Sequence, residues 1–199
     1  TYLNETEIDK IFSLDLSQNL ELRDSHHLFI IGLWTGLRLG DLIRFDQFKI
    51  IKDRIVITAT DKTGEKATIP LHYQVKEVLE ARGNRPFVRV NEVKFNKDIK
   101  IICKLAGINE VMVGRKRVPG KNRKVKSYYP KYELISSHTC RRSFVTNHYG
   151  KIDDKTIMAI TTHKSYNQFM KYIKTTTDES ASKMEELWRN SLKSKGNGK

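Results

Sequence analysis

The sequence is poor in cysteine and contains no long apolar run. Only Cys103 and Cys140 occur in its 199 residues, which are too few and too far apart for a disulfide framework or a Cys-x-x-Cys metal site. No stretch approaches the roughly 20 apolar residues that span a bilayer, and residues 1–10 lack the pattern of a secretory signal. We therefore expect a cytoplasmic protein with reduced thiols, no membrane segment and no bound metal.

Acidic residues are also scarce. The chain has 23 Asp and Glu against 37 Lys and Arg, which gives a formal net charge of +14. Such an excess of positive charge predicts a polyanionic partner, with nucleic acid as the first choice and an acidic membrane surface as the second. The 38% of hydrophobic residues is enough for the core of one ordinary domain.

The spacing of apolar residues predicts a mainly helical domain. Asn4 and Glu7 have the spacing of a capping box and predict a short helix that includes Phe12. Apolar residues at intervals of three and four predict a largely buried helix over 19–37. Gly36 and Gly40 bracket Arg38, so we expect a sharp corner there and a second short helix near Asp41.

Two hairpins are predicted among these helices. A β-branched run from Ile55, a turn with Gly64 and a return run before Pro70 predict the first, with Lys62 at its tip. The second is solvent-exposed and turns at Pro119–Gly120. It carries seven cations: Arg115, Lys116, Arg117, Lys121, Arg123, Lys124 and Lys126. Further helices are predicted over 73–81, 90–106, 155–160, 165–174 and 180–192. We expect a single α+β, mainly α, domain over 1–192 with a small antiparallel β-sheet, and a flexible basic tail over 193–199.

The segment SSHTCRRSFVTNHYG, residues 136–150, has the pattern of a helix that is rich in cations. His138 and Arg141 are three residues apart, so on a helix they share one face. A guanidinium on a buried helix face is costly unless an anion meets it. The segment therefore predicts an anion-binding site, and Cys140 is expected to serve in packing.

The motifs TGLRLGDL and HTCRRSF, a lysine on a hairpin between them, and a His followed nine residues later by a Tyr occur in this order. Over roughly residues 5–188 this set resembles the catalytic domain of the tyrosine recombinase, or phage integrase, family, and in particular integrases of mobile elements. The resemblance implies the fold of that catalytic domain. It also implies the activity of a site-specific recombinase that cuts and rejoins double-stranded DNA through a 3′-phosphotyrosine, without cofactor or metal. It also implies that an N-terminal core-binding domain, absent from this chain, accompanies it.

The resemblance assigns roles to six residues. Arg38 and Arg141 would bind the scissile phosphate, which suits the planar, always charged guanidinium. His138 would assist proton transfer or hold the phosphate. His163, in ITTHKS where the family usually has LGHSS, would donate a hydrogen bond to it, with Thr162 in the place of the glycine. Lys62 would protonate the leaving 5′-hydroxyl, with Lys66 as the alternative.

Tyr172 would be the nucleophile. Tyr166 is the rival, but the two tyrosines are six residues apart and would lie on different faces of one helix. Arg142 points away from Arg141 and would meet the DNA backbone or an acidic neighbour. The seven cations of the second hairpin would also contact DNA.

Simpler interpretations of the same residues are open. Arg38 and Arg141 could be structural ion-pair partners of residues such as Asp41 or Asp46, and the histidines could be core or capping residues. A type IB topoisomerase or a non-catalytic DNA-binding module is the alternative function. The last predicted helix has an apolar side that consists of Ala181, Met184, Leu187 and Trp188. This side predicts either assembly of the protein on DNA, as dimer to tetramer, or packing of the helix on its own domain.

Overall fold

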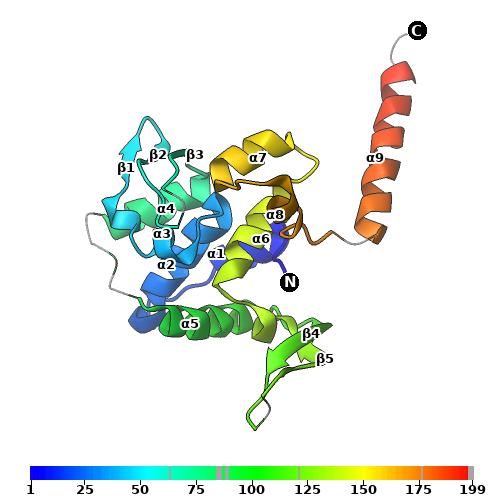
Figure 1. The fold of residues 1–199 in the computed structure, drawn as a ribbon. Coiled ribbons are helices and arrows are strands. Elements are labelled where there is room, and N and C mark those ends of the chain that lie inside the picture. Colours follow the sequence, from blue (N-terminus) through cyan, green and yellow to red (C-terminus); the bar gives the residue numbers. More distant parts are fainter. Residues whose placement is uncertain (63, 84–86, 88–89, 121, 176, 197–199) are drawn as a thin grey trace.

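The computed structural model describes residues 1–62, 64–83, 87, 90–120, 122–175 and 177–196, and helices account for most of them (Figure 1). The helices are α1 (Glu5–Phe12), α2 (Leu20–Thr35), α3 (Leu39–Leu42), α4 (Tyr73–Arg82), α5 (Glu92–Leu105), α6 (Ser137–His148), α7 (Asp154–Thr161), α8 (Tyr166–Met170) and α9 (Thr177–Gly196). The strands are β1 (Lys49–Ile51), β2 (Arg54–Ile57), β3 (Ala67–Pro70), β4 (Val111–Arg117) and β5 (Lys124–Pro130). The fold class is the predicted one.

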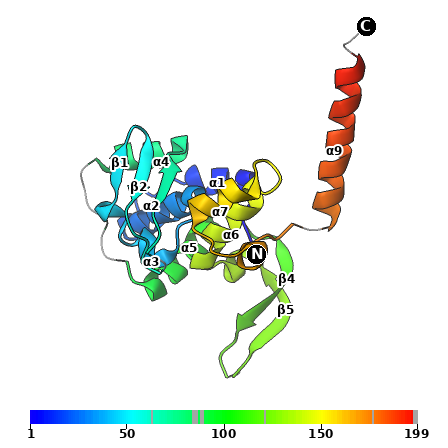
Figure 2. The same cartoon turned by 45° about the horizontal axis from the view of Figure 1, so that its top comes forward.

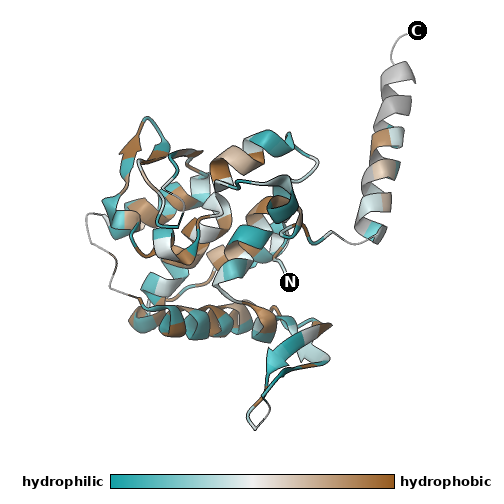
Figure 3. Cartoon of the chain, viewed as in Figure 1, coloured by the Kyte–Doolittle hydropathy of each residue, from teal (hydrophilic) through white to brown (hydrophobic). Residues whose placement is uncertain are grey.

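Helix α2 forms the centre of the domain. Its residues from Leu28 to Leu33 are buried, and α1, α4, α5 and α6 all contact it. The capping box of α1 is present as predicted, with Asn4 accepting from the N–H of Glu7. Hydrophobic and hydrophilic residues alternate along the helices of the body (Figure 3), as expected of helices that cover a core with one side. Within the described residues, none of the helices has the length and apolar character needed to cross a membrane.

The corner after α2 depends on a glycine. Gly36 closes the helix with a left-handed backbone at φ +65°, and a Cβ there would lie 2.9 Å from the ring of Phe144. Both the conformation and the close packing exclude a larger residue. Arg38 follows at the start of α3, so the predicted corner is confirmed.

The first hairpin is confirmed and is part of a three-stranded antiparallel sheet in the order β1-β2-β3. Ile57 pairs with Ala67, which leaves Lys62 in the connecting loop. We did not predict β1. Its two-residue turn to β2 uses Lys52 and Asp53, both with positive φ, and such a turn is recognised in sequences mainly by glycine or asparagine.

The basic hairpin is confirmed as β4 and β5, which extend away from the helical body (Figures 1 and 2). Cross-strand partners share a face of a hairpin. Arg115 lies opposite Lys126, and Arg117 lies opposite Lys124. Lys121 falls outside the described residues.

Two predicted helix ends were wrong. Helix α8 ends at Met170 and not at Lys174, because the side chain of Thr146 takes over the backbone groups beyond it. Its hydroxyl donates to the carbonyl of Tyr172 and accepts from the N–H of Lys174, each at 3.2 Å. Helix α9 continues to Gly196, past the predicted end at Leu192, because no helix-breaking residue occurs before that glycine.

Candidate active site

A cavity of about 240 Å³ lies where several separate segments meet. Five of the six predicted catalytic residues line it: Arg38, Lys62, His138, Arg141 and Tyr172. They come from the start of α3, the β2–β3 loop, α6 and the turn after α8. His163 is absent from this wall and lines a neighbouring cavity together with Lys66.

The guanidinium of Arg141 is the most constrained group of the site. Its side chain is buried, with the residue 2% exposed. Nη1 donates to the carbonyl of Gly36 at 3.0 Å, Nη2 donates to the carbonyl of Thr161, and Nε donates to Nε2 of His163 at 3.3 Å. Burial and the charge of Arg38 lower the pKa of Arg141 to about 9, so it stays charged at neutral pH. Neutral acceptors hold this charge, and the alternative of a structural ion pair does not describe it.

Arg38 lies beside Arg141, and among the described residues no carboxylate is in hydrogen-bond contact with it. Its Nη1 donates to Oγ1 of Thr162 at 3.3 Å. The acids named as alternative partners are engaged elsewhere: Asp41 pairs with Arg44 at 3.1 Å, and Asp46 accepts from the backbone N–H of Phe87. Two guanidinium groups therefore face one small cavity, which Asp41, Asp61 and Glu92 also line. An anion is the ligand that the guanidinium pair favours.

Lys62 is held over the cavity by a buried acid. Asp41, 1% exposed, accepts from the backbone N–H of Asp61 at 2.6 Å, and Asp61 directly precedes Lys62. A Cβ at Gly40 would lie 2.7 Å from the carboxylate of Asp61, so a larger residue there would displace that side chain. These contacts fix the loop beside Arg38, whereas Lys66 is directed to the other cavity.

His138 lies on the rim of the cavity and is exposed. The preceding residue, Ser137, donates its backbone N–H to Oδ1 of Asn96 on α5 at 2.8 Å, which fixes the start of α6. Partial burial and the charge of Arg142 lower the pKa of His138, while Glu92 opposes this shift. The imidazole is therefore mostly neutral at neutral pH.

His163 contacts Arg141 from the side of the neighbouring cavity. Because an arginine only donates, Nε2 of His163 must be the acceptor of the Arg141 Nε–H, and we assign the proton of the neutral ring to Nδ1. Oγ1 of Thr161 lies 2.7 Å from Nδ1 and donates its own proton to the carbonyl of Ile157. Burial and the charges of Arg141 and Arg38 lower the pKa of His163 to about 3. Its predicted donation to a phosphate would need a proton on Nε2.

The two candidate tyrosines have different surroundings. Tyr172 is half-buried, its ring centroid lies 4.8 Å from that of His163, and the guanidinium carbon of Arg141 lies 5.4 Å from the same ring centroid. Tyr166 is exposed, and its hydroxyl donates to Asp154 at 2.9 Å, which raises its pKa. The structure brings Tyr172 to the cations and leaves Tyr166 on the surface.

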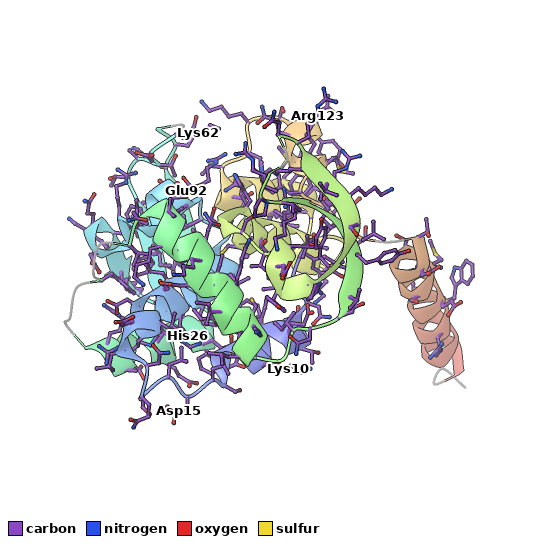
Figure 4. The ribbon with its side chains drawn as sticks, turned by 90° about the horizontal axis from the view of Figure 1, so that it is seen from below. Lys10, Asp15, His26, Lys62, Glu92 and Arg123 are labelled. Carbon is purple, nitrogen blue, oxygen red and sulfur yellow. The ribbon has the colours of Figure 1, made fainter. Side chains whose placement is uncertain are left out.

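The hairpin cations fall on two faces. Arg115, Arg117, Lys124 and Lys126 are exposed on one face, which we call the outer face. Lys116 is on the other face, where its Nζ lies 2.5 Å from Glu133 and 5.7 Å from the ring centroid of Tyr129. Seen from below (Figure 4), Arg123 and Lys62 lie along the same edge of the molecule, opposite Asp15.

Arg142 is half-buried among other cations. Its charge lowers the pKa values of the Thr1 amino group, of His138 and of Lys174. In the part of the chain that the structure describes, no ion pair of Arg142 is present, so of the two predicted partners the acidic neighbour is not seen there.

The sequence analysis missed three supporting residues: Asp41, Thr146 and Thr161. Each holds a site element through a hydrogen bond to a residue distant in the sequence. Only Asp41 had a signal, since it lies within the TGLRLGDL motif. Nothing in the local pattern distinguishes Thr146 or Thr161 from other helical threonines.

The fold and the cavity define the class: the structure matches catalytic domains of tyrosine recombinases. XerA recombinase aligns with a TM-score of 0.66 at 15% identity, covering 94% of this chain and 63% of the other. XerH bound to its difH substrate gives 0.63 at 17%, covering 94% and 52%. A lambda integrase dimer bound to a COC′ core site gives 0.58 at 19%, covering 87% and 48%.

The chain belongs to the phage integrase family, whose pattern it matches over residues 1–179. No curated protein matches the sequence. The chain spans between 48% and 63% of the length of the three structural relatives named above, so it corresponds to a part of them.

We predict that His163 in the DNA-free protein is a neutral Nδ1–H tautomer from pH 5 to pH 8. Two-bond ¹⁵N–¹H correlation spectra of the imidazole should show this pattern and a titration midpoint near 3. Because the unfolded histidine titrates at about 6.5, the unfolded state binds more protons below that pH, and this residue makes the fold less stable as the pH falls from about 6.5 towards 3. A midpoint between 6 and 7 would contradict the assigned network.

Proposed function

We propose that this chain is the catalytic part of a site-specific DNA recombinase that cuts and rejoins strands through Tyr172. One observation carries the proposal: the fold gathers two arginines, a lysine, a histidine and a tyrosine from separate segments around one cavity of about 240 Å³. Membership of the phage integrase family supports the same activity. Integration or excision of a mobile element is the process in which such an enzyme would act.

In the proposed reaction the phenolic oxygen of Tyr172 attacks a DNA phosphorus. A bond from Tyr172 to phosphorus forms, the bond from phosphorus to the 5′-oxygen breaks, and a 3′-phosphotyrosine results. The reverse attack by a 5′-hydroxyl restores the DNA strand. Because the phosphodiester energy is kept in the covalent intermediate, the reaction needs no nucleotide cofactor and no metal.

The cations stabilise the transition state. Arg38 and Arg141 would bind the non-bridging oxygens, whose negative charge increases during attack, and the fixed position of Arg141 means that little reorganisation is needed. His138 on the rim would bind the same phosphate or assist the loss of the phenolic proton. Without DNA, His163 would hold Arg141 by accepting its Nε–H. An incoming phosphate would raise the pKa of His163, and a proton gained on Nε2 would be donated to the phosphate in place of that contact.

Lys62 is the proposed general acid. The leaving 5′-oxygen must gain a proton, and an ammonium group at the cavity wall can supply it. Lys62 lines the same cavity as Tyr172, whereas Lys66 lines the neighbouring one. The geometry therefore favours Lys62 over its alternative.

The outer face of the hairpin is the proposed surface for the DNA backbone. Arg115 opposite Lys126, and Arg117 opposite Lys124, place like charges side by side, and each such pair destabilises the hairpin in the absence of a counter-charge. A polyanion bound along this face removes that cost. Further DNA contacts would come from Arg123, which lies at the same edge of the molecule as Lys62 (Figure 4). Lys121 and the half-buried Arg142 would add others.

Helix α9 is the proposed contact to a second copy of the chain. It stands apart from the helical body (Figures 1 and 2), and Met184 and Trp188 on one side of it are 47% and 62% exposed. A second protomer on the same DNA would cover these side chains. The lambda integrase relative is a dimer on its core site, which favours this occupant over packing on the same domain.

Two alternative functions share parts of this description. A type IB topoisomerase would also form a tyrosine adduct but would not exchange partner strands. A non-catalytic DNA-binding module would bind through the basic surfaces alone and would form no adduct. The five residues around the cavity favour an enzyme over the binding module.

Tyr172→Phe should abolish the covalent protein–DNA adduct and leave duplex affinity within about twofold, because it removes one oxygen and no charge. The substrate is a nicked suicide duplex whose recombination site has been chosen by selection of bound duplexes, and adducts are counted on denaturing gels. Tyr166→Phe is the matched control and should form the adduct normally. Loss of the adduct in Tyr166→Phe alone would move the nucleophile to that residue.

Replacing Arg115, Arg117, Lys124 and Lys126 by Gln should weaken DNA binding and flatten its salt dependence. Each lost phosphate contact lowers the slope of log K against log salt by about 0.9. Lys116→Gln, on the other face, is the control and should leave the slope unchanged. If the fourfold variant keeps the parent slope, the outer face does not contact DNA.

Lys62→Ala should slow cleavage of ordinary DNA about 100-fold or more, as expected for loss of a general acid. The rate should recover on a substrate whose bridging 5′-oxygen is replaced by sulfur, because a thiolate leaves without a proton. Arg38→Ala should be slow on both substrates. Recovery in Lys66→Ala and not in Lys62→Ala would transfer the role to Lys66.

Truncation after Thr177 should leave DNA binding by single protomers and prevent assembly of two or more on one duplex, as measured by native mass spectrometry. Replacing Met184 and Trp188 by Ser should have the same effect, since it removes the apolar contact and keeps the chain length. Glu185→Gln is the control on the same helix. Normal assembly of the truncated protein would show that α9 does not join protomers.

A further inference from the structure

Thr162 has a backbone conformation that its side chain disfavours. It ends α7 with φ +53° and ψ +43°, in the left-handed region. A β-branched residue pays a steric penalty there that glycine does not. Among the described residues, Lys52 and Asp53 also combine a side chain with positive φ, and they form an exposed turn. Thr162 is different because it is buried, with 9% of its surface exposed.

The turn directs three consecutive residues at the two arginines of the site. The carbonyl of Thr161 accepts from Arg141, Oγ1 of Thr162 accepts from Nη1 of Arg38 at 3.3 Å, and Nε2 of His163 accepts from Arg141. The backbone N–H groups of Thr162 and His163 close the end of α7 on Ala159 and Met158. The left-handed residue is therefore the point at which the chain changes direction between two contacts to Arg141.

The acceptor of the Arg38 hydrogen bond is a hydroxyl and not a carboxylate, and this difference affects the charge of the site. A carboxylate at this position would hold the guanidinium more tightly, but it would cancel the charge that a phosphate needs. A hydroxyl fixes the direction of one N–H and leaves the charge intact. A glycine would make the same turn without strain, but it would leave Arg38 without this acceptor.

We propose that Thr162 is a positioning residue that orients Arg38 for the scissile phosphate, and that its strained conformation persists because the hydroxyl is needed at that place. The inference rests on the proposed function and adds to it a residue that does not line the cavity of about 240 Å³ but contacts a guanidinium that does. It requires that a substitution that removes both the hydroxyl and the strain lowers the cleavage rate and does not lower the stability of the fold.

The experiment compares Thr162→Gly with Thr162→Ser in the full chain. Thr162→Gly removes the strain and the hydroxyl, so its melting temperature should equal or exceed that of the parent, by up to about 4 °C. Its cleavage rate with saturating DNA should fall about tenfold, as for loss of one hydrogen bond to a charged group, while its affinity for DNA stays unchanged. Thr162→Ser keeps the hydroxyl and should cleave within about threefold of the parent.

Lys52→Gly is the matched control, because it also relieves a positive φ but lies in the β1–β2 turn. It should be at least as stable as the parent and cleave normally. Parent-like cleavage by Thr162→Gly would overturn the proposal, and so would a Thr162→Ser protein as slow as Thr162→Gly. A lower melting temperature for Thr162→Gly would show that the conformation is not strained and would also overturn it.

A measurement without DNA separates this inference from the proposed function. Rotation of the Arg38 guanidinium about its Nε–Cζ bond, followed by ¹⁵N exchange spectroscopy, should be faster in Thr162→Gly than in the parent and Thr162→Ser. Equal rotation rates would overturn the positioning role even if the parent cleaves DNA. If the rates differ as expected and the parent forms no adduct, the proposed function fails and the contact to Arg38 stands.

Discussion

The buried guanidinium of Arg141 is the constraint on which the rest of the site depends. It is 2% exposed, and it is held by two carbonyls and an imidazole, none of which carries a negative charge. These acceptors belong to the ends of α2 and α7, so the same charge that would bind a phosphate also fixes how these helices meet α6. Burying a charge without a hydrogen-bonded carboxylate lowers the stability of a domain, and a binding site for an anion is a reason to keep it there.

The other site residues are placed by neutral or buried contacts that leave their charges available. The β2–β3 loop with Lys62 is held through the backbone of Asp61 on Asp41, and the turn with Tyr172 is held through its carbonyl on Thr146. Arg38 is held by the hydroxyl of Thr162. In each case the supporting bond leaves the proposed reacting group itself unneutralised, so the cavity stays preorganised for a ligand that brings negative charge.

The pattern of the sequence predicted the helices, the two hairpins and the glycine corner well, because these follow from local periodicity, caps and turn residues. It failed where a distant side chain decides the backbone. Helix α8 stops at Met170 because Thr146 satisfies the groups beyond it, and β1 was missed because its turn uses Lys52 and Asp53 instead of glycine. The resemblance named the residues of the cavity, but spacing alone did not show that Lys62 and Lys66 line different cavities.

The sequence by itself determined most of the secondary structure, the excess of positive charge, the membership of the family and the identity of most of the proposed catalytic residues around the cavity, since these depend on residue types and their order. Only the tertiary structure decided which groups are buried and what they bind. It set His163 behind Arg141 with a depressed pKa, separated Tyr172 from Tyr166, and put Thr162 in a left-handed turn against Arg38. The physical reason is that burial, pKa and hydrogen-bond direction are properties of the space between segments, which periodicity along one segment does not encode.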